Sequence, residues 1–234
     1  MEDEFILNAP QEYRSKLIAS RKEQILMVDW IDLENRIQLG DIRLVAGFDT
    51  AFDEENNLAC AGVVVVDFRT LETVEEHITY FTPEIPYIPS FLHLRESKGY
   101  HSVYNKIDEK PDVSIFDGNG ILHPYKTGLA TLMGLELKIP TIGIAKKLFM
   151  GEFDPPLKKG GYSNILLENE IIGIAFQSKE LPAKPIFLSP GHFVNFSLTI
   201  NIIREFILNQ KYQTKLPLPL YRVDQLVNEQ LRKE

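Results

Sequence analysis

The chain has one cysteine, no long hydrophobic run and no excess of positive charge, and each shortage excludes a class of protein. Because Cys60 is the only cysteine among 234 residues, no disulfide can form within the chain, and we expect a reducing compartment. No apolar run approaches the roughly 20 residues that a membrane-spanning helix needs. Residues 1–13 carry acids and no apolar core of a secretory signal, so we expect a cytoplasmic protein without a membrane partner.

Positive charge is in short supply, with 25 Lys and Arg against 33 Asp and Glu and a formal net charge of −8. This balance argues against broad electrostatic binding to nucleic acid. An acidic total can nevertheless include clustered carboxylates that a bound metal neutralises. The sequence contains no Cys or His cluster of the kind that binds zinc.

Three extended segments follow one another closely after an N-terminal helical region. Residues 1–40 predict helix, with apolar side chains at near-helical spacing: Tyr13, Leu17, Ile18, Ile25 and Leu26. Residues 42–52, 58–68 and 74–82 predict strands separated by short turn-like stretches. These three segments therefore predict an antiparallel meander.

Helices and strands alternate in the rest of the chain. We expect helices over 90–107, 125–137 and 196–208 and after residue 224, strands over 112–116, 141–145 and 185–189, and a hairpin from 162–168 to 170–179. The proline-rich residues 215–220 are interpreted as a spacer. Because parallel returns need crossovers, the predicted fold class is α/β, with a mixed sheet of a three-strand meander and parallel strands flanked by helices. No repeat or linker divides the chain, so one domain over residues 1–234 is expected.

A carboxylate lies where the helix over 90–107 should be apolar. The positions within about 60° of Glu96 on that helix are otherwise uncharged: Leu92, Gly99, Tyr100, Val103 and Ile107. An unpaired carboxylate on a buried helix face costs several kcal/mol. Either an ion pair with Arg43 or Lys146, or a bound cation, would account for Glu96.

Two aspartates end apolar strands. Asp49 follows LVAGF in the first strand, and Asp117 follows VSIF in the fourth. An acid that ends such a run usually lies at a sheet edge next to a site. If these strands pair, the helix between them can bring Glu96 to the same point. Three carboxylates without matching bases predict a hard divalent cation, Mg²⁺ or Mn²⁺.

Five segments resemble, in this order, the motifs of the endonuclease V family: GFDTAF, PYIPSFLHLRE, DGNGILHPYKTGLATLMGLELKIPTIGIAKKLFMG, KPIFLSPGH and LPLPLYRVDQLV. The resemblance spans roughly residues 40–228. It implies an RNase H-like fold and Mg²⁺-dependent cleavage of nucleic acid at the second phosphodiester bond on the 3′ side of a deaminated base, chiefly hypoxanthine. The products would be a 3′-hydroxyl and a 5′-phosphate.

The same resemblance implies roles for individual residues. Asp49, Glu96 and Asp117 resemble the family's metal-binding carboxylates, Lys146 its active-site lysine and His192 its histidine near the active site. We expect Lys146 to hold the scissile phosphate or a water by charge-assisted hydrogen bonds. His192 is expected to assist proton transfer, the alternative being a structural histidine in a loop.

The PYIP segment resembles the family's strand-separating wedge. Pro86 and Pro89 stiffen the loop, so that Tyr87 and Ile88 are presented with little entropy left to lose on binding. An exposed aromatic ring can replace a base in the stack while the damaged nucleotide is extruded. The glycines of DGNG, beginning with Gly118, allow close backbone approach, and their N–H groups are expected to read the base edge. The alternative for PYIP is a hydrophobic loop that anchors the following helix.

Three positions depart from the family pattern. Ser90 stands where glycine is usual, Tyr125 where arginine is common and Lys147 where serine is usual. These departures leave the lesion range and the choice between DNA and RNA open. The sequence predicts a monomeric nuclease acting on DNA with deaminated bases in DNA repair. Two alternatives stay open, an RNA-directed inosine endonuclease and a noncatalytic nucleic-acid-binding relative.

Overall fold

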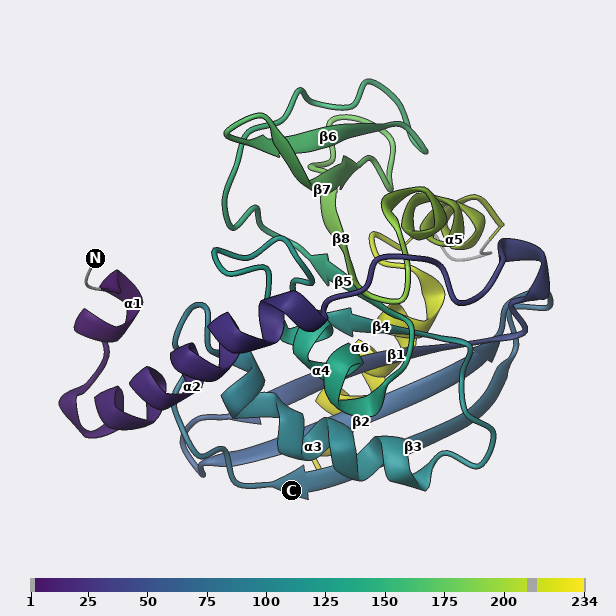
Figure 1. The fold of residues 1–234 in the computed structure, drawn as a ribbon. Coiled ribbons are helices and arrows are strands. Elements are labelled where there is room, and N and C mark those ends of the chain that lie inside the picture. Colours follow the sequence, from purple (N-terminus) through teal and green to yellow (C-terminus); the bar gives the residue numbers. More distant parts are fainter. Residues whose placement is uncertain (1–2, 210–213, 234) are drawn as a thin grey trace.

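The computed structural model describes residues 3–209 and 214–233. Within these residues, eight strands form one mixed sheet in the order β3-β2-β1-β4-β5-β8-β7-β6 (Figure 1). The strands are β1 (Leu44–Asp53), β2 (Leu58–Asp67), β3 (Thr73–Phe81), β4 (Val113–Asp117), β5 (Thr141–Ala145), β6 (Tyr162–Leu167), β7 (Glu170–Phe176) and β8 (Ile186–His192). The helices are α1 (Glu4–Leu7), α2 (Arg14–Met27), α3 (Leu92–Lys106), α4 (Leu129–Leu137), α5 (Phe196–Asn209) and α6 (Leu218–Leu231). The expected α/β fold with a mixed, helix-flanked sheet is confirmed.

The meander is formed by β1, β2 and β3. These strands pair antiparallel, with Leu44 opposite Asp67 and Ala59 opposite Phe81. The four valines of β2, residues 63–66, are fully buried because helices cover both faces of the sheet. A strand buried on both faces has a continuous apolar run rather than an alternating one. The predicted meander is therefore confirmed in order and direction.

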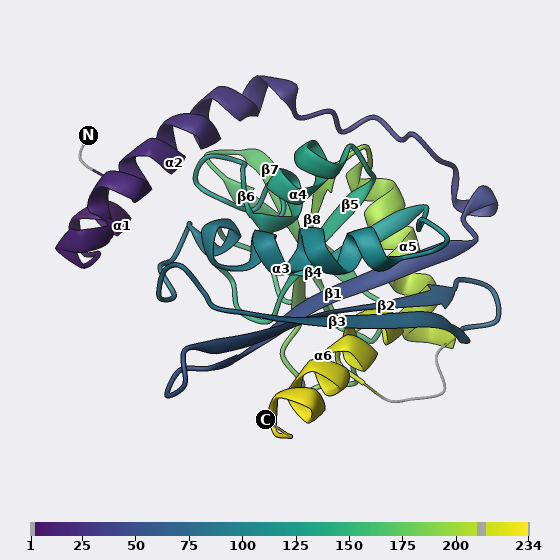
Figure 2. The same ribbon diagram turned by 90° about the horizontal axis from the view of Figure 1, so that it is seen from below.

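Parallel pairing follows the meander. β4 pairs with β1 and with β5 in parallel, with Phe48 opposite Phe116 and Ser114 opposite Thr141. The crossovers contain α3 and α4, which pack on one face of the sheet, whereas α5 and α6 pack on the other (Figure 2). None of the helices in the described parts of the chain is long and apolar enough to cross a membrane. The carboxyl ends of β1, β4 and β5 consequently meet at one edge.

The N-terminal region differs from the expectation of helix throughout residues 1–40. Helix α2 is present, but residues 31–38 are not helical. Three of the apolar positions at helical spacing are at least 46% exposed: Ile18, Ile25 and Leu26. Leu17 alone among the five positions is fully buried, and the other buried contacts of α2 are polar, through Ser20, Arg21 and Gln24. Helix α2 lies apart from the sheet (Figure 2), so most of its apolar side chains at helical spacing do not face the core.

Helix α6 begins earlier than predicted. Residues 215–220 were expected to form a spacer, but Leu218–Leu220 form the first turn of α6. Proline is accepted in that turn because its missing N–H would have no partner within the helix. Leu218 and Leu220 are 2% and 0% exposed, because α6 packs across β1 and β2.

Gly47 permits the close approach of α6 to β1. An added Cβ at Gly47 would lie 2.4 Å from the carbonyl carbon of Pro219 and 2.6 Å from the backbone nitrogen of Leu220. Backbone atoms cannot move aside alone, so Gly47→Ala is expected to lower the free energy of unfolding by about 1–3 kcal/mol in urea titrations. Gly40→Ala is the control, because no atom lies within 4 Å of a Cβ built there. Equal losses in both variants would contradict this account.

Candidate active site

Asp49 and Asp117 lie side by side at the edge of the sheet where the carboxyl ends of β1 and β4 meet. The parallel register sets Phe48 opposite Phe116, so the following residues, Asp49 and Asp117, are neighbours across the sheet. The Asp49 carboxylate accepts a hydrogen bond from the backbone N–H of Thr50 at 2.8 Å. The sequence predicted this juxtaposition from the two apolar runs, and the register confirms it.

Glu96 lies on the buried face of α3 and is only 6% exposed. The hydroxyl of Tyr100, one turn later, donates a hydrogen bond to Glu96 Oε2 at 2.6 Å. Neither base considered as its ion-pair partner is bonded to it, because Arg43 pairs with Glu109 and Lys146 pairs with Asp117. Among the described residues, Glu96 therefore has no ion-pair partner, so the ion pair that the sequence offered as one explanation for this acid is absent.

The three carboxylates share one electrostatic environment. Burial, with a smaller contribution from the charge of Asp117, raises the pKa of Glu96 to about 8, although the hydrogen bond from Tyr100 opposes this shift. Burial, followed by repulsion from Asp117, raises the pKa of Asp49 well above its ordinary value. Burial also raises the pKa of Asp117, although Lys146 opposes this shift. Buried acids that repel one another are stabilised in the ionised form by a cation.

Lys146 directly follows β5 and lies at the same edge. Its Nζ is 2.6 Å from Asp117 Oδ2 and 3.7 Å from Asp224 Oδ1 on α6. Burial lowers the pKa of Lys146, but the Asp117 carboxylate outweighs burial and the pKa is raised overall. Sequence reasoning missed Asp224, because residues before 225 were not assigned to the last helix. In the sequence, Asp224 directly follows the apolar residue Val223. The structure shows that Val223 is buried on α6, so Asp224 lies next to a core-facing position of that helix.

The chemistry of these donors fits a hard divalent cation. Carboxylate oxygens are the ligands that Mg²⁺ and Mn²⁺ prefer. Across residues 3–209 and 214–233, however, no three Asp, Glu, His or Cys side chains already converge as a complete metal shell. Binding would therefore require side chains at this edge to reorient.

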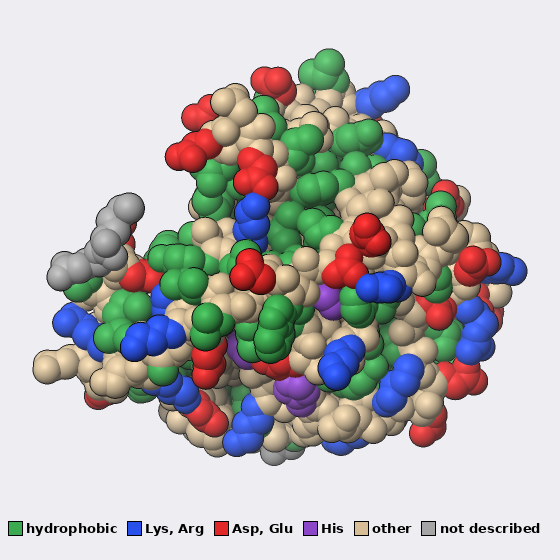
Figure 3. Space-filling view, viewed as in Figure 1, with side chains coloured by type: hydrophobic (Ala, Val, Ile, Leu, Met, Phe, Trp, Pro, Cys, Tyr) green, Lys and Arg blue, Asp and Glu red, His purple; other side chains and the backbone are tan. Residues whose placement is uncertain are grey.

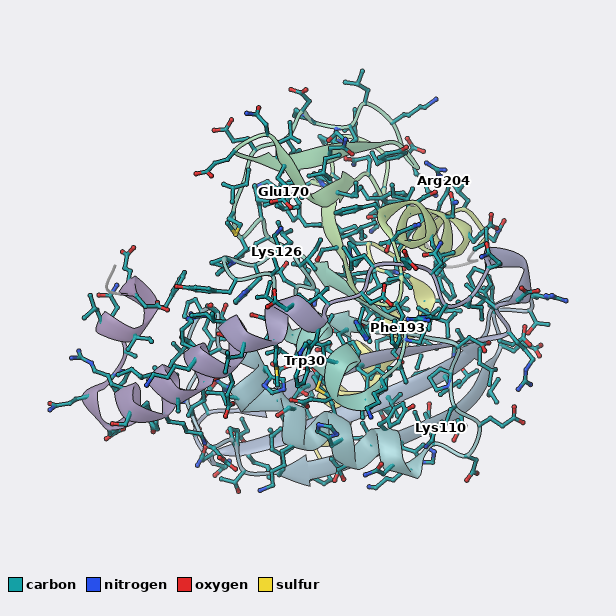
Figure 4. All side chains as sticks on the ribbon, viewed as in Figure 1. Trp30, Lys110, Lys126, Glu170, Phe193 and Arg204 are labelled. Atoms are coloured by element: carbon teal, nitrogen blue, oxygen red, sulfur yellow. The ribbon has the colours of Figure 1, made fainter. Side chains whose placement is uncertain are left out.

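The structure does not bring His192 to the acids, which corrects the position expected for it. His192 ends β8 opposite Thr141, the first residue of β5, whereas Asp117 is level with Ile144 near the end of β5. His192 therefore lies level with the first residue of β5, and its ring is 3.7 Å from that of Phe193, which is labelled in Figure 4. Its Nδ1 accepts a hydrogen bond from the Asp32 N–H at 3.2 Å, and burial lowers its pKa. These contacts fit the structural alternative, because β8 runs antiparallel to β5 and carries its C-terminal residue away from the active edge.

The PYIP loop divides between exposure and burial. Tyr87 is 62% exposed and Pro86 is also exposed, whereas Pro89 is half-buried. Ile88 is only 5% exposed and packs in a cluster with Leu17 and other apolar side chains of the N-terminal region. The expectation that Tyr87 and Ile88 are both presented is thus right for Tyr87 and wrong for Ile88, which anchors the loop.

A small cavity of about 60 Å³ lies beside this loop. Its walls include Tyr87, Ser90, Asn119 and His123. The ring of His123 stacks on Phe149, with centroids 6.0 Å apart and planes inclined by 8°. Aromatic, aliphatic and polar side chains therefore line this cavity, which reaches the loop after Asp117 through Asn119.

The glycines of DGNG do not offer free backbone donors, which corrects a second expectation. The N–H of Gly118 donates to the carbonyl of Ile144 at 2.8 Å. The N–H of Gly120 donates to Ser189 Oγ at 2.8 Å. A Cβ at Gly120 would lie 2.2 Å from the carbonyl oxygen of Pro190, so this glycine serves close packing against β8.

On the face seen in Figure 3, basic side chains do not form one continuous surface. Figure 3 shows Lys and Arg scattered among acidic side chains over the visible face. Lys126, labelled in Figure 4, is paired with Glu170 at 2.5 Å. This distribution agrees with the net charge of −8 and indicates that binding of a polyanion depends on local contacts.

An RNase H-like sheet with half-buried carboxylates at the ends of neighbouring strands defines a nuclease-type α/β protein. The endonuclease V family model matches residues 26–225. Endonuclease V of Dictyoglomus thermophilum is 38% identical over 182 residues, which cover 77% of this chain and 76% of the relative. The chain therefore belongs to the endonuclease V family of nucleases.

Solved structures agree with this assignment. The crystal structure of endonuclease V from Bacillus subtilis is similar with a TM-score of 0.83 and 29% identity, covering 99% of this chain and 95% of that chain. Endonuclease V from Ciona intestinalis, crystallised with a 24mer DNA containing an inosine followed by a ribo-adenosine, gives a TM-score of 0.83. Its identity is 23%, with 94% of this chain and 99% of that chain covered, so this likeness shows the fold alone.

Proposed function

We propose that this chain is a divalent-metal-dependent endonuclease that cuts DNA next to deaminated bases, chiefly hypoxanthine. The cut falls at the second phosphodiester bond on the 3′ side of the lesion and leaves a 3′-hydroxyl and a 5′-phosphate. The observation that carries the proposal is the group of half-buried Asp49 and Asp117 and buried Glu96, which repel one another at one sheet edge in a chain of this family. The inosine-containing DNA bound by the Ciona relative supports the choice of substrate. The chain acts as a single-domain monomer in DNA repair.

Asp49, Glu96 and Asp117 would hold the metal, with Mg²⁺ expected and Mn²⁺ as a substitute. When bound, divalent ions supply activation of a water and stabilisation of the leaving oxygen in an in-line displacement. Lys146 contributes its own positive charge, and its contact with Asp117 leaves it within reach of a phosphate at the same edge. Asp224, 3.7 Å from Lys146, orients the ammonium from the side of α6.

Tyr87 is proposed to fill the gap that the extruded base leaves in the stack. Tyr87→Ala is expected to weaken binding of an inosine-containing strand by about 1–3 kcal/mol, because a stacked aromatic ring contributes about this much per base. Fluorescence anisotropy in EDTA measures the affinity without cleavage. Tyr162→Ala is the matched control, because Tyr162 is a 47% exposed tyrosine on β6, far along the sheet. If the Tyr87 variant and the unmodified protein bound the strand with equal affinity, Tyr87 would not stack in place of the extruded base.

End-labelled strands test the proposed reaction. DNA and RNA strands, each with or without one inosine, are incubated with the protein in Mg²⁺ and in EDTA. The expected result is a cut in inosine-containing DNA, one nucleotide beyond the inosine, in Mg²⁺ only. Cleavage confined to RNA would instead assign the RNA-directed alternative. Intact binding with no cut in any strand would indicate a noncatalytic relative.

A further inference from the structure

Three lysines continue the edge of the sheet that carries the carboxylates: Lys179, Lys184 and Lys215, together called the lysine cluster. Strand β8 runs antiparallel to both β5 and β7, so the start of β8 lies between the ends of the other two strands. Lys184 lies shortly before β8, and Lys179 lies shortly after β7. Lys215 lies shortly before α6, the helix whose Asp224 is 3.7 Å from Lys146.

The charges in the lysine cluster act on one another. The pKa of Lys215 is lowered by burial and then by the charges of Lys146 and of the two other lysines in the cluster. Such an effect falls with distance, so the ammonium groups lie near one another. Lys146 contacts two aspartates, whereas the three side chains of the cluster have no ion pair or hydrogen bond with the residues that the structure describes. The cluster is therefore unneutralised positive charge in a chain of net charge −8.

A buried amide fixes the loop that carries two of these lysines. Gln177 is 1% exposed, and its Nε2 donates to the carbonyl oxygens of Lys179 at 2.8 Å and Ala183 at 2.7 Å. Lys184, the next residue, is exposed, and Lys179 is half-buried. Charges on a fixed loop bind an anion with less loss of entropy than charges on a free one. The loop therefore presents its two ammonium groups in a prepared arrangement.

The phosphates of a nucleic-acid strand fit this arrangement. Lysine binds phosphate as a point charge, and several lysines along one edge match a polyanion. Neighbouring strands of a sheet lie about 4.8 Å apart, so the order β4-β5-β8-β7 covers about 14 Å. One strand of B-form DNA advances about 3.4 Å per nucleotide. The cluster is thus about three to four nucleotides away from a phosphate held at Asp117.

The direction of the bound strand follows from the two faces of the sheet. Tyr87 precedes α3 on one face, whereas Lys215 precedes α6 on the other (Figure 2). In the proposed reaction the lesion lies on the 5′ side of the cut. A strand with its damaged base beside Tyr87 and its scissile phosphate at Asp117 therefore reaches the lysine cluster with its 3′ continuation.

We propose that Lys179, Lys184 and Lys215 bind the phosphates of the nucleic-acid strand on the 3′ side of the cut. This inference rests on the proposed function, because the position of the lesion relative to the cut sets the direction of the strand. The three lysines bind and orient this part of the strand, while Lys146 is the lysine within reach of the scissile phosphate.

Inosine-containing strands with 3′ arms of two or eight nucleotides test the contact, with affinity measured by fluorescence anisotropy in EDTA. The unmodified protein is expected to bind the longer arm about tenfold more tightly at low salt. The triple variant Lys179→Gln, Lys184→Gln, Lys215→Gln is expected to lose most of this gain. Its plot of log affinity against log salt should be less steep by about 2, since each phosphate contact on a single strand contributes about 0.7.

The triple variant Lys106→Gln, Lys110→Gln, Lys138→Gln is the matched control. These exposed lysines precede β4 or β5, so they lie at the opposite end of the parallel strands, and their replacement removes the same charge. The control is expected to keep the gain from the longer 3′ arm. Thermal unfolding shows whether each variant is folded. Lys184→Gln alone, at an exposed position, gives the same comparison with a smaller expected loss.

An equal gain from the longer 3′ arm in the first triple variant and the unmodified protein would overturn the proposed contact, as would an equal loss of affinity for both arms in the folded variant. Strands with a lengthened 5′ arm test the direction, and a gain there that only this variant loses would contradict it. Failure of the unmodified protein to prefer a strand with inosine over one without it would instead refute the proposed function, before any variant is compared.

Discussion

Asp117→Asn is expected to lower the rate of cleavage at inosine by about a thousandfold or more while leaving binding of the lesion largely intact. The carboxylate of Asp117 lies beside Asp49, accepts from Lys146 at 2.6 Å and raises the pKa of both Asp49 and Glu96. An amide of the same size keeps the packing of β4 but removes the charge that a divalent cation and Lys146 both contact. Single-turnover cleavage and anisotropy separate the rate from the affinity.

Asp108→Asn is the matched control for this variant. Asp108 is an exposed aspartate in the loop before β4, so its replacement also removes one negative charge. It is expected to leave the cleavage rate within about twofold, because exposed charges away from the site contribute little. If Asp117→Asn cleaved as fast as the control, Asp117 would not be a metal ligand, and the proposed metal site of Asp49, Glu96 and Asp117 would be contradicted.

Glu96→Gln is expected to stabilise the metal-free protein at pH 8 while abolishing cleavage. Burial raises the folded-state pKa of Glu96 from a reference value of 4.5 to about 8. Between these two values the unfolded chain loses the proton and the folded chain keeps it, so the free energy of unfolding falls as pH rises. The whole effect is on the order of a few kcal/mol. Glutamine removes this dependence because its side chain does not ionise.

Thermal unfolding in EDTA from pH 5 to pH 8.5 measures this effect. The unmodified protein is expected to lose stability across that window, and Glu96→Gln is expected to lose less. Added Mg²⁺ should raise the unfolding temperature of the unmodified protein at pH 8 and leave that of the variant nearly unchanged, since a ligand stabilises only the state that binds it. Glu76→Gln, an exposed glutamate on β3, is the control. If stability changed with pH in the same way in all three proteins, burial would not raise the pKa of Glu96 as proposed.

Much of the fold could be predicted from local patterns. The valine run of β2 and the apolar runs that end at Asp49 and Asp117 are long enough to specify buried strands, and the short separators specify antiparallel neighbours. The meeting of Asp49 and Asp117 at one edge of the sheet could be predicted from the same apolar runs, because parallel strands bring their carboxyl ends together. The burial of Glu96 followed from helical spacing on α3.

The remaining errors share a physical cause, which is packing between segments distant in sequence. His192 was expected near the acids, but its position depends on the antiparallel direction of β8 beside β5. Ile88 is buried by the N-terminal helices, which no local pattern indicates. The first turn of α6, and with it Asp224, was obscured by prolines that a helix accepts at its start.

Anomalous diffraction from crystals grown with Mn²⁺ tests the central claim most directly, because it locates the ion without relying on activity. The account predicts anomalous density in contact with the carboxylates of Asp49, Glu96 and Asp117, with none at this position in crystals of Asp117→Asn. A protein that binds Mn²⁺ elsewhere, or not at all at saturating concentration with an inosine-containing strand present, would contradict the account.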